Sequence, residues 1–325
     1  MRGVFVTKFG GSGVLACQHT DMPSPGPTEV LIRVAAASVN FADIKARYGK
    51  YHGAKTPPYI PGLDVAGTIE AVGGEVTQFQ VGQRVIAFPN RGSYAEYTTA
   101  DQVLTYAIPD ALDMETAAAC PIVSFTSYNM LHKAAALQAG ETVLIHAAAG
   151  GVGTTAIQLA KILGARQVIG TVGSEAKADA AYQAGADFVI AGDRADFAAK
   201  VQELTDGKGV DVILDSIGGQ VLENSLSCLA MFGRLVQFGN AGGGAGGISW
   251  GSLSPGCRSI LGYSLGTYRR ERPEALRQSG EEVIALLASG RLRMIIDRTF
   301  SLEEAAQAQD WVEQRRSRGK VLLIP

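Results

Sequence analysis

One stretch, HAAAGGVG at residues 146–153, limits most strongly how this chain of 325 residues folds. It follows the apolar run TVLI and leads into TTAIQLAKILGA, whose apolar residues recur at helical spacing. A glycine turn between a strand and a helix is the setting in which a loop binds a dinucleotide phosphate. A strict G-x-G-x-x-G pattern has glycine where Ala148 stands, but alanine also keeps the turn narrow.

The two glycines that fit the pattern have separate expected roles. Gly150 lets the backbone approach a pyrophosphate, and Gly153 lets the helix pack closely on the sheet. The amides and the dipole at the start of the helix favour negative charge. The alternative is a turn that only packs a strand against a helix, and the alternating segments that follow argue against it.

The pattern of the chain changes near residue 123. Before it, short β-rich runs are separated by glycine and proline, which predicts a partly closed antiparallel β domain. After it, strand and helix segments alternate, which predicts a doubly wound parallel sheet. Residues 241–247 are expected to form a loop, and 259–265 (SILGYSL) a further strand.

Near the end of the sequence, helices are expected at 273–289 and 302–314 and a strand at 320–324, none with phosphate-binding glycines. They are therefore assigned to the first domain. The expected fold is α/β, with a β-rich catalytic domain of residues 1–122 and 266–325 and a Rossmann nucleotide-binding domain of residues 123–265.

Composition excludes several classes of function. The net charge is −2, and the basic residues are dispersed apart from the pairs Arg269-Arg270 and Arg315-Arg316, interpreted as solvated surface. Nucleic acid is therefore not an expected partner. No apolar run reaches membrane-spanning length and no signal peptide is recognisable, so we expect a cytoplasmic protein without a membrane partner. The four cysteines are too scattered for a disulfide framework or a clustered metal site.

The end of the second expected strand bears on the choice of nucleotide. An NAD site usually has a carboxylate there, for the ribose 2′-hydroxyl. This strand ends at Gly173 without one, and Ser174 and Lys177 offer a hydroxyl and a cation for a 2′-phosphate, which favours NADPH. Alternatively, Lys177 is an ordinary exposed lysine, and the nearby Glu175 disfavours a phosphate.

Several motifs together resemble one family over essentially the whole chain: SVNFAD (38–43), RYGKY (47–51), PGLDVAG (61–67), VGQRV (81–85), GSYAEY (92–97), HAAAGGVG (146–153), GVDVILDS (209–216) and GKVL (319–322). The family is the medium-chain dehydrogenase/reductase superfamily, in its zinc-free quinone oxidoreductase branch, which includes the zeta-crystallins. The resemblance implies a GroES-like domain, a Rossmann domain inserted in it, and a cofactor in the cleft between them.

The resemblance also implies a set of cofactor-binding positions. They are Asn40, Thr126, Gly150, Gly151, Val152, Gly153, Gly173, Ser174, Lys177, Phe238, Gly239, Asn240, Tyr263, Ser264, Leu265 and Lys320. Three departures bear on this assignment: Lys45 replaces a common tyrosine, Ala191-Gly192 replaces an Asn followed by Tyr or His near the adenosine phosphate, and the 241–247 loop has no fixed family pattern. Arg194 is a candidate replacement for the lost phosphate partner.

No metal is expected. Asn40 and the pair Leu63-Asp64 stand where zinc-dependent relatives have ligands, and the loop for a structural zinc is absent. The histidines His19, His52, His132 and His146 are scattered and interpreted as surface or structural residues. Because there is also no nucleophile motif, the cofactor is expected to carry the chemistry, by direct hydride transfer to a quinone or an α,β-unsaturated carbonyl.

Asn40 and Tyr51 are the catalytic candidates, since an amide and a phenol both donate to a developing oxyanion. Alternatively, Asn40 ties its own loop and Tyr51 only packs.

Two other functions stay open: an enoyl-thioester reductase of a polyketide or fatty-acid type pathway, and a non-enzymatic, crystallin-like NADPH-binding protein. A homodimer is expected from the resemblance and from SILGYSL as an edge strand.

Overall fold

The computed structural model describes residues 1–51, 55–192, 197–244 and 246–325. The chain divides into two compact units, Met1–Phe125 with Gly266–Pro325 (unit 1) and Thr126–Leu265 (unit 2). The sequence predicts boundaries after 122 and 265, close to this division. That the units have separate catalytic and cofactor-binding roles stays a prediction. Within the described ranges, no helix combines the length and the apolar content that crossing a bilayer requires.

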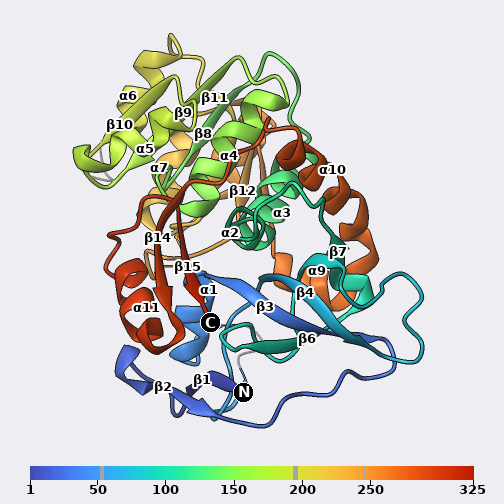
Figure 1. The fold of residues 1–325 in the computed structure, drawn as a ribbon. Coiled ribbons are helices and arrows are strands. Elements are labelled where there is room, and N and C mark those ends of the chain that lie inside the picture. Colours follow the sequence, from blue (N-terminus) through green and yellow to red (C-terminus); the bar gives the residue numbers. More distant parts are fainter. Residues whose placement is uncertain (52–54, 193–196, 245) are drawn as a thin grey trace. The chain divides into compact units, whose positions relative to one another are not determined.

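Unit 2 is built on a six-stranded sheet, drawn in green to orange in Figure 1. All its paired strands are parallel, in the order β10-β9-β8-β11-β12-β13. The strands are β8 (Thr142–Ile145), β9 (Gln167–Val172), β10 (Phe188–Ala191), β11 (Val210–Asp215), β12 (Leu229–Gln237) and β13 (Ser259–Gly262). The order runs outward from β8 to one edge and then from β11 to the other, which confirms the predicted doubly wound sheet.

Helices connect these strands, as the alternating sequence pattern predicts. They are α4 (Gly151–Ile162), α5 (Ala178–Gln183), α6 (Phe197–Leu204), α7 (Gln220–Ser227) and the short α8 (Trp250–Leu253). Helix α4 packs on α5, and α6 packs on α7. Because parallel crossovers are right-handed and the strand order reverses after β10, these two pairs cover opposite faces of the sheet.

Unit 1 contains a seven-stranded sheet in the order β14-β15-β3-β4-β5-β7, with β6 also pairing with β3. Its strands are β3 (Glu29–Val39), β4 (Val65–Val72), β5 (Arg84–Ala87), β6 (Tyr97–Asp101), β7 (Thr105–Ala107), β14 (Ile296–Ser301) and β15 (Lys320–Ile324). The pairs are antiparallel except β14 with β15. A separate hairpin joins β1 (Arg2–Val6) to β2 (Leu15–His19).

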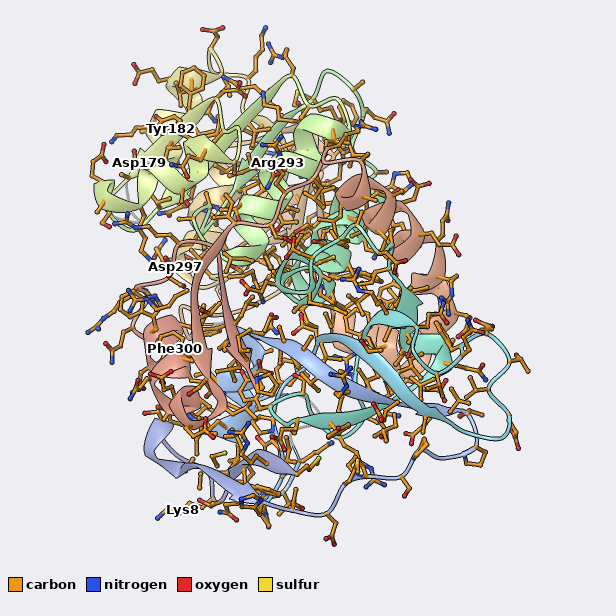
Figure 2. All side chains as sticks on the ribbon, in the orientation of Figure 1. Lys8, Asp179, Tyr182, Arg293, Asp297 and Phe300 are labelled. Atoms are coloured by element: carbon orange, nitrogen blue, oxygen red, sulfur yellow. The ribbon has the colours of Figure 1, made fainter. Side chains whose placement is uncertain are left out.

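The helices of unit 1 include α1 (Phe41–Arg47), α2 (Met114–Ala119), α3 (Pro121–Tyr128, which continues into unit 2), α10 (Arg277–Ala288) and α11 (Ala305–Glu313). Helix α9 (Leu265–Glu271) begins at the last residue of unit 2. Helix α11 packs on β14 and β15. There Trp311 donates a hydrogen bond of 2.7 Å to Asp297 on β14, and Phe300 on the same strand packs against the core (Figure 2).

Several elements differ from the sequence prediction. The strands β2, β7 and β14 were not predicted, because LACQH and IDRTFS are largely half-exposed or exposed without clear alternation and TYA is only three residues long. The helices α1, α2, α3 and α9 were not predicted either. The helix expected at 273–289 is a 3-10 turn, Pro273–Leu276, followed by α10. Proline fits the first turn of a helix, where its missing N–H costs no hydrogen bond.

Candidate cofactor and substrate sites

The cofactor residues predicted in unit 2 collect at one edge of the parallel sheet. Gly150 follows β8, Ser174 follows β9, Phe238 follows β12 and Tyr263 follows β13. Because parallel strands have their carboxyl ends at the same edge, these segments lie along one side of the sheet. In open α/β sheets this is the edge at which ligands bind, at the point where the strand order reverses.

The glycine loop forms a tight turn after β8. The Gly150 amide donates a hydrogen bond of 3.0 Å to the carbonyl of Ala147, and Gly150 caps helix α4. The first turn of α4 contains Gly151, Val152 and Gly153, whose amides have no partner within the helix by geometry. A Cβ at Gly153 would lie 2.4 Å from the Ala147 oxygen, so the close contact of turn and helix requires glycine.

Ala148, which replaces the first glycine of the pattern, is accommodated by a glycine on the neighbouring strand. Its amide donates a hydrogen bond of 3.0 Å to the Thr171 carbonyl on β9, and its side chain is fully buried. A Cβ added at Gly170 would lie 2.7 Å from the Ala148 methyl. The extra methyl at position 148 therefore occupies space that Gly170 leaves empty.

His146, directly after β8, is a buried structural histidine. Its Nδ1 is 2.9 Å from the Thr171 hydroxyl on β9, and its Nε2 is 2.9 Å from the Ser225 hydroxyl on α7. Phe197 of α6 packs edge-to-face on the imidazole ring, at 4.8 Å between centroids. The ring therefore joins three elements beneath the glycine loop, which agrees with the structural role predicted for it.

The segment after β9 fits a 2′-phosphate. Strand β9 ends at Val172, and the exposed residues Gly173 and Ser174 lead into a 3-10 turn, Glu175–Lys177. A Cβ at Gly173 would meet nothing within 4 Å, so this position is open, and no carboxylate stands at the strand end. Lys177, at the end of the turn, is half-buried rather than fully exposed. This donor set suits NADPH better than NADH.

The remaining predicted cofactor segments of unit 2 are held by backbone hydrogen bonds. The Phe238 amide donates to the Asp215 carbonyl at the end of β11, and the Tyr263 amide donates to the Gln237 carbonyl, each at 3.0 Å. Gly239 approaches β11 closely, because a Cβ there would lie 2.9 Å from the Ser216 oxygen. Asn240 and Ser264 are exposed beside these segments, and Leu265 is buried.

Thr126 lies on α3 and is largely buried. The hydroxyl of its neighbour Ser127 donates to the Val152 carbonyl at 3.3 Å, which ties α3 to the first turn of α4. Arg194 lies outside the described residues, and the 241–247 loop is described except for residue 245.

In unit 1, Asn40 and Lys320 belong to one buried polar network. The Lys320 ammonium donates to the Asn40 amide oxygen at 2.8 Å, and the Asn40 amide nitrogen donates to Asp64 at 2.9 Å and to the Ser38 carbonyl at 3.3 Å. Asp43 accepts from the Asn40 backbone amide at 2.8 Å. Asn40 therefore ties its own loop, as the structural alternative predicts, while its role toward a substrate stays a prediction.

Burial governs the charges in this network. Desolvation raises the pKa of Asp43 to about 7, with Asp64 adding to the shift, while the backbone amide of Asn40 opposes it. Burial also lowers the pKa of Lys320, and the carboxylates of Asp64 and Asp43 oppose that change. Burial therefore disfavours the charged forms of both Asp43 and Lys320, and the opposite charges of the cluster partly offset this effect.

Tyr51 lies near Arg269, a residue whose role the sequence reasoning missed. Tyr51 is half-buried, and burial raises the pKa of its hydroxyl, opposed by the positive charge of Arg269. Arg269 is also half-buried, and its guanidinium lies over the Phe88 ring at 4.8 Å from the centroid. The interpretation of Arg269-Arg270 as solvated surface is therefore wrong for Arg269. Arg270 is exposed and pairs with Glu271 at 2.7 Å.

The segments that hold zinc in metal-dependent relatives are used differently here. Both oxygens of Asp64 accept hydrogen bonds, from Ser38 and Asn40 on one side and from the Ile122 amide on the other. Among the residues that the structure describes, no three His, Cys, Asp or Glu side chains are grouped to hold a metal ion. Zinc independence itself stays a prediction.

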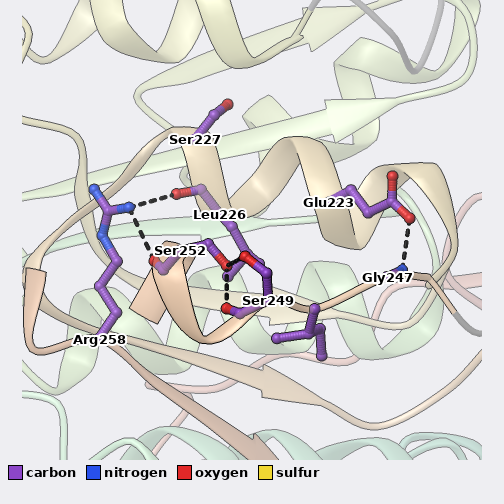
Figure 3. Close-up of a pocket in the computed structure, with 8 residues that line it drawn as sticks. Glu223, Leu226, Ser227, Gly247, Ser249, Ser252 and Arg258 are labelled. Atoms are coloured by element: carbon purple, nitrogen blue, oxygen red, sulfur yellow. Dashed lines mark hydrogen bonds between the residues drawn. The ribbon is translucent and has the colours of Figure 1, made fainter. Parts of the chain in front are cut away.

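A pocket on the surface of unit 2 contains none of the predicted cofactor residues (Figure 3). Its Arg258 side chain donates to the carbonyls of Leu226 and Ser252, and the Gly247 amide donates to Glu223. The lining residues are Glu223, Leu226, Ser227, Gly247, Ile248, Ser249, Ser252 and Arg258.

The doubly wound sheet and its glycine loop define a dinucleotide-binding protein, and comparisons with known proteins narrow this class. Residues 26–110 match the alcohol dehydrogenase GroES-like domain, and residues 151–281 match the family described as zinc-binding dehydrogenase. Quinone oxidoreductase of Pseudomonas aeruginosa is 41% identical over 98% of this chain and 97% of its own length. Quinone oxidoreductase of Sus scrofa is 36% identical over 100% and 98%.

A solved structure agrees with these sequence matches. Escherichia coli quinone oxidoreductase complexed with NADPH is 33% identical, covers 100% of both chains and superposes with a TM-score of 0.92. The chain belongs to the medium-chain dehydrogenase/reductase superfamily, in its zinc-free quinone oxidoreductase branch. The predicted family and fold, GroES-like and Rossmann domains together, are confirmed.

Proposed function

We propose that this protein is an NADPH-dependent reductase of quinones or α,β-unsaturated carbonyls that acts by direct hydride transfer without zinc. The observation that carries the proposal is the strand end at Gly173, where a hydroxyl and a lysine replace the carboxylate of NAD sites at the ligand-binding edge of a doubly wound sheet. The similarity to quinone oxidoreductases supports the acceptor class.

Each group of residues has a part in holding the cofactor. Ser174 and Lys177 hold the 2′-phosphate, and the helix start at Gly151–Gly153 holds the pyrophosphate. The other predicted positions of unit 2 line the rest of the nucleotide: Thr126, Gly150, Gly173, Phe238, Gly239, Asn240, Tyr263, Ser264 and Leu265. NADPH supplies the hydride, so the protein contributes orientation, exclusion of water and donors for the oxygen that gains charge.

In unit 1, Tyr51 is the better supported donor to the substrate. A tyrosine hydroxyl is protonated at neutral pH, and burial raises the pKa of Tyr51 further. Asn40 already donates to Asp64 and Ser38, so its direct hydrogen bond to a substrate requires an exchange of partners. We assign Asn40 and Lys320 jointly to organising this region, with Lys320 as a cofactor contact.

The test is NADPH absorbance during incubation with a panel of quinones, enones and enoyl thioesters. We expect fast oxidation of NADPH with quinones or enones and no activity with simple alcohols and NADP⁺. Preference for the thioesters supports the enoyl-thioester reductase instead. Tight binding of NADPH without turnover on any acceptor supports the crystallin-like alternative. Stoichiometric zinc, lost together with activity on chelation, contradicts the zinc-free mechanism.

We also propose that the protein is a cytoplasmic homodimer. Among the strands that the structure describes, β13 is the last of its sheet and pairs with β12 alone. Met231, Phe232, Ile248 and Trp250, from the neighbouring segments of unit 2, are exposed apolar residues, with Trp250 79% exposed. A second copy of the chain that pairs along β13 forms hydrogen bonds with the N–H and C=O groups on the edge of this strand. It also covers the exposed apolar residues.

A further inference from the structure

Arg269 is a cation in an unusual position. It lies on α9, is half-buried, and stacks on the Phe88 ring, which is itself fully buried. Its Nε is buried without a hydrogen-bond partner, and no carboxylate of the described residues forms an ion pair with its guanidinium. Burial lowers the pKa of Arg269, opposed by the charges of Asp64 and Asp43 and by Tyr51. A cation that is partly removed from water without an ionic partner is costly, so such a position points to a ligand that supplies the missing anion.

The surroundings of Arg269 are aromatic. The rings of Phe88, Tyr106 and Phe125 pack edge-to-face, with centroids 5.0 to 6.3 Å apart. The Tyr106 hydroxyl is buried with no hydrogen-bond partner in the described part of the chain. Tyr51 is close enough to Arg269 for the positive charge of Arg269 to act on its hydroxyl. A guanidinium and two phenols beside flat apolar walls match a planar aromatic ligand that carries an oxygen anion.

Further positive charge is near this cluster. Lys55 donates to the Asn90 carbonyl, and its pKa is lowered by burial and by the neighbouring charges of Arg91 and Arg269. Arg277 stacks on Tyr106, a second member of the aromatic cluster, with its guanidinium 4.7 Å from the ring centroid. Asp43 and Asp64, the carboxylates that act on Arg269, are engaged with their own donors. Lys55 and Arg277 therefore add positive charge around the aromatic cluster.

We propose that Arg269 binds the substrate oxygen that becomes negatively charged when a quinone is reduced, and that the preferred substrates are therefore planar aromatic quinones. This inference rests on the proposed function. The quinone accepts one hydride from NADPH, that is, two electrons and one proton, and the product is a hydroquinone monoanion. The guanidinium pairs with the oxygen that carries this charge, and one proton from water then completes the hydroquinone. Removing such a donor costs about 10²- to 10³-fold in turnover.

The binding test uses 4-nitrophenol, a planar phenol whose anion absorbs visible light, with the full-length protein and no cofactor. We expect the wild-type protein to bind the phenolate in preference to the phenol, so that the apparent pKa of bound 4-nitrophenol is about one unit or more below that of the free compound. Arg269→Met should abolish this shift, and Arg269→Lys should retain part of it. Arg270→Met, which removes the exposed neighbouring charge, is the matched control and should leave the shift unchanged.

Two results overturn the proposal: a full spectral shift in both folded Arg269 variants, or an equal loss in the Arg270 control. Circular dichroism checks that each variant folds. If Arg269→Met does not fold, the binding test is decided by Arg269→Lys alone.

Measuring NADPH oxidation separates this inference from the proposed function. If quinones are reduced equally fast by wild type and Arg269→Met, the role of Arg269 is wrong and the function stands. Suppose instead that the pKa shift of bound 4-nitrophenol depends on Arg269 but no quinone is reduced. Then the proposed function is wrong, and so is the assignment of quinones as substrates.

Discussion

The Lys320 ammonium donates a hydrogen bond of 2.8 Å to the amide oxygen of Asn40, and both residues are buried. This contact joins β15 to the start of α1, and it places a positive charge beside the Asp64 and Asp43 carboxylates. The two positions were predicted separately as cofactor contacts. Because the two side chains are in direct contact, we expect the loss of either residue to disturb the other.

Replacing Lys320 with methionine should destabilise the protein. The Asn40 oxygen is then left buried without this donor, which costs about 1 to 3 kcal/mol in the free energy of unfolding. Urea unfolding measures the change. Lys8→Met, at an exposed lysine of unit 1 (Figure 2), is the control and should lie within about 0.5 kcal/mol of wild type. Equal stability of the Lys320 variant and wild type contradicts the network described here.

The stability of the protein should depend on pH through Asp43. Its pKa is about 7 in the folded protein against an ordinary value of 3.8, so between these values the folded state holds a proton that the unfolded state releases. This contribution to the free energy of unfolding therefore falls as the pH rises through that window, by about 1.4 kcal/mol per pH unit at most. Asp43→Asn lacks the titrating group. Urea unfolding at pH 5 and pH 7 should show a smaller decrease for the variant, and identical slopes for both proteins would falsify the assignment.

Ala148 and Gly170 should behave as a coupled pair. Gly170→Ala places two methyl groups about 2.7 Å apart and should destabilise unit 2 and weaken NADPH binding. Adding Ala148→Gly removes the clash, so the double variant should recover much of the loss. The measurement is a double-mutant cycle of thermal unfolding and NADPH affinity. Additive effects of the two changes would show that the two methyl positions do not compete for the same space.

Lys177→Ala should weaken NADPH binding and leave NADH binding nearly unchanged. Loss of a charged hydrogen bond to the 2′-phosphate corresponds to about 1 to 3 kcal/mol, or about 5- to 150-fold in Kd. Fluorescence titration with both nucleotides provides the comparison, and Lys208→Ala, at an exposed lysine of the same unit, is the matched control. Lys177 does not bind the 2′-phosphate if the variant loses affinity for NADH and NADPH equally. The same conclusion follows if the wild-type protein binds NADH more tightly than NADPH.

Phe232→Asn should weaken self-association. Phe232 is 67% exposed and has a positive φ of 62°, a conformation that asparagine adopts more readily than phenylalanine. The change therefore removes exposed apolar area without adding backbone strain. Sedimentation should give about twice 34.0 kDa for wild type and a larger monomer fraction for the variant. A wild-type protein that is monomeric at micromolar concentration contradicts the dimer.

Local signals in the sequence account for the parts of the fold that were predicted. The strand, turn and helix around Gly150 are contiguous, and so is the strand end at Gly173, so residue types and spacing were enough to locate them. The interactions of Arg269 depend on Phe88 and Tyr51, which lie far away in the sequence, and nothing near Arg269 distinguishes it from its exposed neighbour Arg270. The strands β2, β7 and β14 were missed for a related reason: their stability comes from pairing, since their own patterns are weak.

The pairing of β15 with β3 also has a consequence for the order of folding. The Lys320–Asn40 contact spans 280 residues, whereas the strands of unit 2 are joined by short successive crossovers. Closing a long loop costs entropy before the contact is gained, and chains dominated by distant pairings fold more slowly. We therefore expect the nucleotide-binding sheet to form early and the polar network of unit 1 to form last. A folding intermediate of this kind would already recognise the cofactor while it still lacked the groups that act on the substrate.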